Sequence, residues 1–399
     1  MKKVLIVNTT RFPVPNNELC SLLLGGVLIF LFIFFPCISY ATNIPTISGK
    51  NAIAIEANSG RILYEKNGFS KASIASTTKI MTLIVSLENN LLDDTVVVSK
   101  KAAWTGGSSV DLKEGDKIKL SELLYGLMLN SGNDAAVAIA EHTSGNLEEF
   151  AKLMNKKAKE IGALNTNFIT PHGLDIEGHY STAYDMAIIS RYALKNSTIS
   201  QIVSTQYYTM HFLDGKTKQL KNTNPLLSFY EGISGMKTGY TGLAGKCLVA
   251  TAKRNDLSVI VVTLGEPSSK LRINDTVKIL DYCFNNYKMY DLRELYPINF
   301  SMKIKKSVKK SITPIYKNSL VLPLLNSEKE NMSIRKHLVE ELIAPIEMNQ
   351  YVGKIQFKTG NEVLGEIEIC SPYSVKKPTI SEYYGIIFNT FLDFKQYIH

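Results

Sequence analysis

The spacing of hydrophobic residues changes several times along the chain, and the first change lies near the N-terminus. From Ser21 to Pro36 nearly every residue is apolar, basic residues precede this run, and Ser39-Tyr40-Ala41 follows it. Such a run between basic and small residues is typical of a secretory signal peptide. We therefore predict a signal over residues 1–41 that is removed after Ala41, with an uncleaved anchor as the alternative.

From residue 42 to about 290 the pattern predicts helices enclosed between strands, which is an α+β arrangement. An N-terminal hairpin turns at Asn58-Ser59-Gly60, and helical spacing on one face is clearest from Leu147 to Ile161. Thr182 and Asp185 resemble a capping box. The other expected elements are the hairpin arms 52–57 and 61–64, a strand at 96–98, helices from Ser121 and over 135–142, strands at 246–252 and 257–264, and a helix over 271–287.

After Asp291 the pattern changes to short alternating stretches, which predict a small β-rich domain over residues 291–372. Its clearest strands are 300–305, 354–357 and 366–369. The last segment, residues 373–399, places aromatic and aliphatic residues at helical spacing after Lys376-Lys377. We expect an amphipathic helix there that binds a membrane surface, although a helix docked on a domain is the alternative.

The net charge and the cysteines restrict the possible functions only slightly. The chain has 399 residues and a formal net charge of +9. That modest excess favours an anionic surface such as a membrane or a cell wall, and it is not clustered enough to indicate nucleic acid. Cys20 and Cys37 fall in the predicted signal. Cys247, Cys283 and Cys370 are widely spaced and form no metal-ligand pairs, so we expect small buried hydrophobes.

Candidate chemistry begins at Ser76-Thr77-Thr78-Lys79, directly before an apolar helix. Residues three apart share one face of a helix, so Ser76 and Lys79 can touch. Unpaired amides at the start of the helix stabilise an anion. Apolar surroundings favour the neutral form of Lys79. A neutral lysine beside a serine is a general base beside a nucleophile, but alone this motif is also compatible with a capped helix and an exposed lysine.

Two further motifs strengthen this hypothesis. Ser131-Gly132-Asn133 sits in a break between two apolar helices, where we expect a hydroxyl and an amide to face a cleft. Lys237-Thr238-Gly239 precedes a buried strand, and its glycine allows a close approach of the backbone to a ligand. Lys237 supplies a positive charge and Thr238 a hydroxyl for a carboxylate. A second Lys-Thr-Gly at 358–360 is expected to be a hairpin turn.

In this order the three motifs resemble the active-site triple of the penicillin-recognising serine enzymes. The wider sequence resembles the D-alanyl-D-alanine carboxypeptidases, which are low-molecular-mass penicillin-binding proteins. The resemblance implies a β-lactamase/DD-peptidase-like antiparallel sheet with flanking helices and a helical subdomain over 42–290, then the small β domain and the tail. The segments that carry it are 53–67, 74–82, 123–142, Pro171-His172-Gly173-Leu174, 180–185 and 235–252.

The resemblance also implies roles for individual residues. Ser76 is the nucleophile that becomes acylated, and Lys79 takes its proton. Ser131 relays a proton to the leaving amine, and Asn133 holds the peptide backbone of the substrate. Lys237, Thr238 and Gly239 form the site for the terminal carboxylate, and the backbone amides of Ser76 and Tyr240 form the oxyanion hole.

The implied substrate is a peptidoglycan stem peptide ending in D-Ala-D-Ala, with β-lactams as inhibitors and without any metal or organic cofactor. The implied location is outside the cytoplasmic membrane, attached to its outer face.

Two rival functions share these motifs. A class A β-lactamase requires a glutamate in a Glu-x-x-Leu-Asn loop, and the stretch from Glu160 to Asn165 has one residue too many and lies at a helix end. The other rival is a non-catalytic wall-binding homologue, which the intact motifs disfavour. We expect His172 to shape a loop at the edge of the cleft and Trp104 to pack against the protein.

Overall fold

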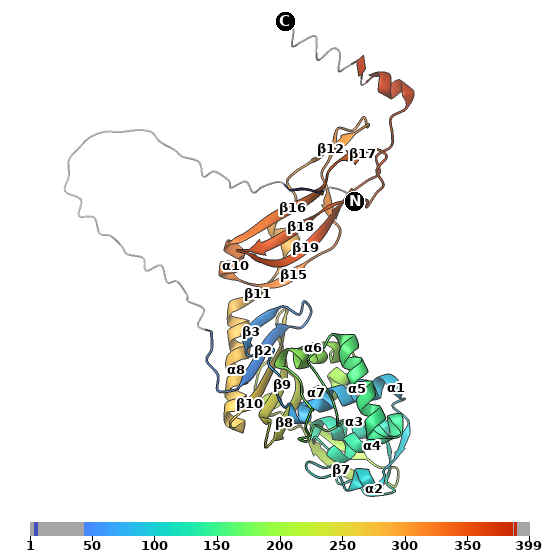
Figure 1. The fold of residues 1–399 in the computed structure, drawn as a ribbon, viewed down its shortest axis with the longest axis vertical. Coiled ribbons are helices and arrows are strands. Elements are labelled where there is room, and N and C mark those ends of the chain that lie inside the picture. Colours follow the sequence, from blue (N-terminus) through green and yellow to red (C-terminus); the bar gives the residue numbers. More distant parts are fainter. Residues whose placement is uncertain (1–3, 7–43, 386, 389–399) are drawn as a thin grey trace, which may run out of the picture. The chain divides into compact units, whose positions relative to one another are not determined.

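The computed structural model describes residues 4–6, 44–385 and 387–388, and the chain divides into two compact units (Figure 1). Of the described residues, the first unit comprises 44–289, and the second comprises those from Tyr290 onward together with Val4–Ile6. The predicted signal lies outside the described residues, except for Val4–Ile6.

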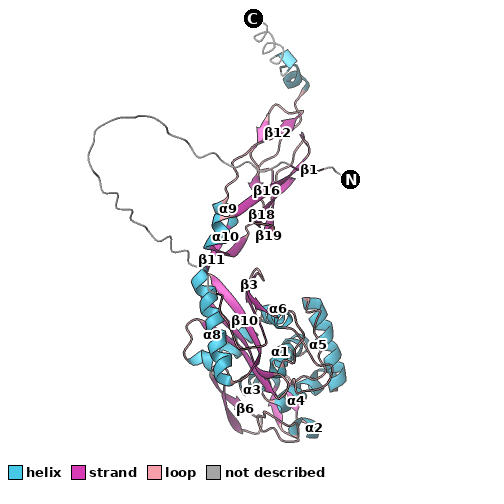
Figure 2. Cartoon of the chain, turned by 60° about the vertical axis from the view of Figure 1, so that its left-hand side comes forward, coloured by secondary structure: helices cyan, strands magenta, loops and turns pink. Residues whose placement is uncertain are grey.

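A five-stranded antiparallel sheet forms the centre of the first unit, in the order β3-β2-β10-β9-β8. Its central strands are almost continuously apolar and buried, because helices cover both faces. Helix α8 packs on one face and α6 on the other (Figure 2). The bounds are β2 (Asn51–Glu56), β3 (Ile62–Lys66), β8 (Ile233–Thr241), β9 (Gly245–Arg254), β10 (Leu257–Glu266), α6 (Ala183–Ala193) and α8 (Ser269–Asn286).

A helical region is inserted between β3 and β8, and α1 and α4 run through its apolar interior. Side chains that accept a bond from a backbone amide begin several helices, as Asn146 does for α5 and Thr182 for α6. The elements are a 3₁₀ turn (Ala75–Thr78), α1 (Lys79–Asn89), β4 (Thr95–Val97), α2 (Lys100–Ala103), β5 (Lys117–Lys119), α3 (Leu120–Leu129), α4 (Asn133–Ser144), α5 (Leu147–Ile161), α7 (Ser197–Ser204), β6 (Tyr207–His211), β7 (Thr217–Lys221) and a second 3₁₀ turn (Pro225–Ser228).

These elements confirm the α+β class and most of the expected boundaries. Helix α5 spans the expected Leu147–Ile161, and the hairpin β9–β10 turns where expected. A boundary that matters for the site is wrong: Asn133 is the first residue of α4 and not part of the break before it. The expectation for Trp104 is also wrong, because its side chain is 79% exposed. An aromatic residue type alone does not fix burial, since folded proteins leave much apolar surface in water.

The second unit is mainly β, with β11 (Tyr287–Asp291) leading into it. Its larger sheet has the order β1-β16-β18-β19-β14, and a smaller sheet has the order β13-β12-β17. Ile355 and Phe357 of β18 alternate with less buried residues and belong to a separate apolar core, and Val352 joins this core beside a bulge at the start of the strand. The bounds are β1 (Val4–Ile6), α9 (Leu292–Leu295), β12 (Met302–Lys305), β13 (Ser311–Ile312), β14 (Ile315–Tyr316), β15 (Val321–Leu325), α10 (Asn326–Glu330), β16 (Met332–Val339), β17 (Leu342–Ile343), β18 (Tyr351–Thr359) and β19 (Glu362–Cys370).

The second Lys-Thr-Gly ends β18 and turns into β19, as expected, with Gly360 at φ 55°. Residues 380–385 and 387–388 are helical, while the remainder of the expected tail helix lies outside the described residues. Cys247, Cys283 and Cys370 are buried and free, as expected. Within the described ranges no helix is both long and apolar enough to cross a membrane.

Candidate active site

Ser76 lies on a tight 3₁₀ turn immediately before α1, and this turn is held from several sides. The hydroxyls of Thr77 and Thr78 donate back to the carbonyls of Ile74 and Ala75 at 2.6 and 2.8 Å. Ala75 has a φ of 47°, an uncommon left-handed conformation for a residue with a side chain. Gly173 presses on the turn, since a Cβ there would lie 2.0 Å from the carbonyl oxygen of Ala75. The Ser76 side chain is thereby left half-buried at a fixed position.

Lys79 is fully buried, and its Nζ is surrounded by three oxygen atoms. It lies 3.0 Å from Ser76 Oγ, 2.7 Å from Asn133 Oδ1 and 3.0 Å from the carbonyl oxygen of His172. Burial lowers the pKa of Lys79 well below its ordinary value, and the nearby charge of Lys237 lowers it further, while Asp134 acts in the opposite direction. The expected contact between Ser76 and Lys79, and the expected direction of the pKa, are therefore present.

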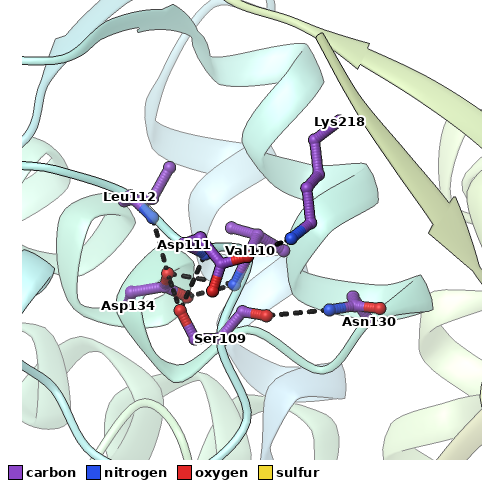
Figure 3. Close-up of polar contacts among 7 residues, drawn as sticks. All are labelled: Ser109, Val110, Asp111, Leu112, Asn130, Asp134 and Lys218. Atoms are coloured by element: carbon purple, nitrogen blue, oxygen red, sulfur yellow. Dashed lines mark hydrogen bonds and ion pairs between the residues drawn. The ribbon is translucent and has the colours of Figure 1, made fainter.

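The segment Ser131-Gly132-Asn133 is fixed by a carboxylate that the sequence reasoning did not single out. Asp134, fully buried at the start of α4, accepts hydrogen bonds from Ser109 Oγ at 2.5 Å and from the backbone amides of Val110 and Leu112 at 3.0 and 3.1 Å (Figure 3). The positive end of the helix also favours this anion. Asp134 thus ties the start of α4 to the loop at 108–112.

Ser131 and Asn133 lie on either side of the start of α4 and have different surroundings. Ser131 is buried and left-handed, with a φ of 61°. The Asn133 amide is used at both ends, because Oδ1 accepts from Lys79 and Nδ2 donates to the Gly106 carbonyl at 2.7 Å. A carbonyl can only accept, so this second bond fixes which atom of the amide faces Lys79. Asn133 therefore connects Lys79 to the loop at 104–108.

The Lys237-Thr238-Gly239 motif lies on β8, at the edge of the sheet and beside the Ser76 turn. A Cβ on Gly239 would lie 3.1 Å from the Ser76 backbone nitrogen and 3.1 Å from Ala75 Cβ. These distances are tighter than ordinary van der Waals contacts, so a side chain here would push β8 away from the turn that carries the nucleophile. Thr238 Oγ1 lies 2.7 Å from Thr223 Oγ1, and Lys237 Nζ donates to the Thr238 carbonyl at 3.0 Å.

Positive charge is concentrated behind this motif. Burial, together with the nearby charge of Arg272, lowers the pKa of Lys237 to about 7. Arg272 is itself buried on α8, and burial lowers the pKa of its guanidinium. Two buried cations repel each other strongly because the surrounding dielectric is low. For the same reason an anion that binds beside them is strongly stabilised. Arg272, which the sequence reasoning did not single out, thus adds to a positive potential suited to a carboxylate.

The loop at 172–179 contributes two uncharged imidazoles, that of His172 near Lys79 and that of His179 beside Thr78. Burial and, to a smaller extent, the charge of Lys79 lower the pKa of His172 to about 3, and burial lowers the pKa of His179 to about 4. His172 Nδ1 accepts from the Leu174 amide, and His179 Nδ1 accepts from the Ile169 amide at 3.0 Å. Both rings therefore act as fixed neutral acceptors. His172 shapes its loop as expected, and its backbone carbonyl contacts Lys79.

Asp175 connects this loop to the turn that follows β8. Its Oδ1 accepts from Thr241 Oγ1 at 2.6 Å, and its Oδ2 accepts from the Leu243 amide at 3.2 Å. Thr241 Oγ1 in turn accepts from the Ala244 amide at 3.1 Å. Tyr240, the expected oxyanion-hole residue, precedes Thr241 on this strand, and its side chain is exposed with Lys246 Nζ stacked 3.2 Å above its ring centre.

Glu160, the glutamate considered for a β-lactamase, does not belong to the site. It lies near the C-terminal end of α5 and forms an ion pair with Lys157 at 2.7 Å. This agrees with the expectation that its near-match to a β-lactamase motif is a coincidence.

Comparison with known proteins identifies the family of this chain. Residues 39–268 match the D-alanyl-D-alanine carboxypeptidase family, and residues 290–377 match the C-terminal domain of penicillin-binding protein 5. The chain is 38% identical to the D-alanyl-D-alanine carboxypeptidase DacF of Bacillus subtilis, over 82% of this chain and 86% of that protein. It is 32% identical to DacC of Escherichia coli, over 82% and 85%.

Solved structures of related proteins have the same fold. Penicillin-binding protein 5 from Haemophilus influenzae has a TM-score of 0.71 at 29% identity, covering 83% of this chain and 98% of that one. The Streptomyces K15 DD-transpeptidase has a TM-score of 0.58 at 37% identity, covering 60% and 98%. The chain therefore belongs to the D-alanyl-D-alanine carboxypeptidase family and is a serine peptidase of the penicillin-binding group.

Proposed function

We propose that Ser76 is the nucleophile of this carboxypeptidase and attacks the carbonyl between the two terminal D-alanines of a peptidoglycan stem peptide. The observation that carries the proposal is the 3.0 Å contact between Ser76 Oγ and the fully buried Nζ of Lys79. The attack forms an ester on Ser76 and releases D-alanine, and water then hydrolyses the ester. Hydroxyl and base lie within the reach that proton transfer requires.

The surroundings of Lys79 support its role as the general base. A neutral amine has two hydrogens and one lone pair. The Asn133 amide oxygen and the His172 carbonyl can only accept, so they take the two hydrogens. The lone pair is then directed to the third neighbour, the hydroxyl of Ser76. Burial and the charge of Lys237 both favour this neutral form.

Ser131 and Asn133 act on the other side of the nucleophile. We assign Ser131 the transfer of the proton to the leaving amine, since it is a buried hydroxyl on a constrained turn beside Asn133. Asn133 already holds Lys79 and the Gly106 carbonyl, so its first role is to fix the base. Its amide then faces the peptide backbone of a substrate lying between α4 and β8.

The terminal carboxylate binds at Lys237, Thr238 and Gly239. The buried ammonium supplies charge, Arg272 adds to the potential, and the Thr238 hydroxyl supplies a hydrogen-bond donor. The oxyanion of the tetrahedral intermediate is assigned to the backbone amides of Ser76 and Tyr240, because Gly239 brings β8 against the Ser76 nitrogen. Removal of one such donor typically costs about 3 kcal/mol of transition-state stabilisation. A β-lactam acylates the same Ser76.

The cellular setting follows from the rest of the chain. We assign residues 1–41 to a signal peptide, 42–290 to the catalytic domain, 291–372 to the β-rich domain and 373–399 to a tail that attaches to the membrane surface. Ile380, Tyr384, Ile387 and Phe388 are exposed apolar residues near the start of this tail. Exposed apolar residues at helical spacing suit the interfacial region of a bilayer. The enzyme then works outside the cytoplasmic membrane, where its substrate lies.

The test is the release of D-alanine from a peptide that ends in D-Ala-D-Ala, with Ser76→Ala as the control. The wild type should release D-alanine and become labelled by penicillin, and the variant should do neither. No release by the wild type would contradict the assignment. Rapid turnover of nitrocefin would instead favour a β-lactamase.

A further inference from the structure

The smaller sheet of the second unit ends in a hairpin rich in lysine. Strand β12 ends at Lys305, and the Ile304 amide donates to the Lys310 carbonyl at 2.9 Å, which closes the turn. The turn reads Lys306-Ser307-Val308-Lys309-Lys310. Val308 is 53% exposed at its tip, and the lysines around it are exposed. The turn therefore presents one exposed apolar side chain between exposed cations.

Two other segments lie against this hairpin. Lys309 Nζ lies 3.7 Å from the ring centre of Tyr373. Val375 and Ile346 exchange two backbone hydrogen bonds of 2.8 Å, and the Met348 amide donates to Ser374 Oγ at 3.0 Å. Residues 303–310, 340–348 and 373–377 therefore form one surface, which we call the basic end. The described part of the tail leaves the domain from this end, near β12 and β17 (Figure 1).

The basic end combines positive charge with exposed apolar groups. Its acidic residues are fewer, and Glu341 is neutralised by an ion pair with Lys305. Elsewhere in this unit Lys317 and Lys354 pair with glutamates. By contrast, no ion pair joins Lys306 or Lys310 to a carboxylate within the described residues. The exposed members are Lys303, Lys305, Lys306, Lys309, Lys310, Lys376, Lys377, Val308, Ile343 and Met348, with Glu340, Glu341 and Glu347 as the acidic ones.

We propose that the basic end is a second membrane-contact surface, which binds the headgroups of anionic phospholipids while Val308 enters the interfacial region. This inference rests on the membrane attachment proposed for the tail. A single weak apolar anchor binds reversibly, and a polybasic patch beside it makes attachment stable. Lysines near an anionic leaflet contribute attraction over about one Debye length, so the patch must lie where the tail enters the bilayer. The contacts with residues 373–377 place it there.

The test measures binding of the purified protein to vesicles of phosphatidylcholine with and without phosphatidylglycerol. The variant Lys306→Gln/Lys310→Gln keeps the Lys309–Tyr373 contact. It should bind the phosphatidylglycerol vesicles on the order of thirtyfold more weakly than the wild type. The matched control Lys329→Gln/Lys358→Gln removes the same charge near the opposite end of β18 and should bind like the wild type. The difference should vanish on pure phosphatidylcholine and shrink at high salt.

A third variant separates this inference from the attachment of the tail. Ile380→Asp/Ile387→Asp should weaken binding to both kinds of vesicle. If this variant binds as tightly as the wild type, the attachment of the tail is contradicted, and the role of the basic end is not. If Lys306→Gln/Lys310→Gln binds phosphatidylglycerol vesicles as tightly as its matched control, the basic end is not a membrane contact. A variant that loses binding to isolated peptidoglycan and not to vesicles would likewise overturn the proposal, in favour of a wall polymer.

Discussion

Lys79 Nζ lies closer to Asn133 Oδ1, at 2.7 Å, than to Ser76 Oγ, at 3.0 Å. The amide of Asn133 is therefore the nearest partner of the proposed base, and its oxygen cannot give up a proton. This contact holds one amine hydrogen away from the serine and helps to direct the lone pair toward it. The asparagine of the second motif thus influences the chemistry of the first.

Asn133→Asp tests this relationship with one changed atom. A carboxylate at 2.7 Å stabilises the ammonium form, so the pKa of Lys79 should rise by at least one unit. Since the base must be neutral, the acid limb of the pH profile for penicillin acylation should move to higher pH. The rate on that limb should fall at least tenfold. Stopped-flow measurement of penicillin acylation across pH gives this limb. The exposed Asn318→Asp is the control for the added charge. An acid limb that Asn133→Asp leaves in place would contradict the role assigned to Asn133.

Lys79→Arg tests whether a proton acceptor is needed at all. A guanidinium is protonated at any accessible pH, so it preserves charge and removes the base. We expect acylation to fall by a factor of 10² or more, which is the usual contribution of general base catalysis. Because the site is fully buried, folding must be checked by circular dichroism. Wild-type acylation by a folded Lys79→Arg protein would show that another group takes the proton.

The pKa of about 7 for Lys237 predicts an alkaline limit to substrate binding. The ammonium form binds the carboxylate and is lost as pH rises through about 7, so kcat/KM for the peptide should decline above that pH. Lys79 and Lys237 interact, so the two limbs report apparent values of the pair. Lys237→Arg stays charged and should move the alkaline limb upward. An alkaline limb that Lys237→Arg leaves in place would assign it to another group.

The sequence was informative about this site where the chemistry is local. Ser76 and Lys79 lie three residues apart at the start of an apolar helix, and helix geometry alone places them in contact. The alternation of β18 and the helical period of α5 likewise predicted burial directly. Asp134, Asp175 and Arg272 could not be found in this way, because their partners are backbone groups and charges distant in the chain. An aspartate inside an otherwise apolar stretch was the only local signal for Asp134.

Asp175→Asn tests a support of the site that only the structure reveals. The carboxylate uses both oxygens to hold the turn after β8, and an amide has one accepting oxygen. Loss of one such bond is worth about 1 kcal/mol, so acylation should slow by roughly fivefold. Because Asp175 acts through Thr241 and Tyr240, kcat should fall more than KM rises. The exposed neighbour Glu177→Gln is the matched control, and equal rates for the two variants would remove the positioning role.

Gly173→Ala tests the contact that holds the nucleophile's turn. A Cβ at this position would lie 2.0 Å from the Ala75 carbonyl oxygen and 2.6 Å from Thr78 Oγ1, so the turn carrying Ser76 must move. Gly173 also has a φ of 81°, which costs about 1 kcal/mol for alanine. Gly145→Ala shares the conformational cost, at a φ of 79°, with open space around the new methyl. Both variants should lower the thermal midpoint, whereas penicillin acylation should fall at least tenfold in Gly173→Ala only. Equal acylation in the two variants would show that the turn does not depend on this contact.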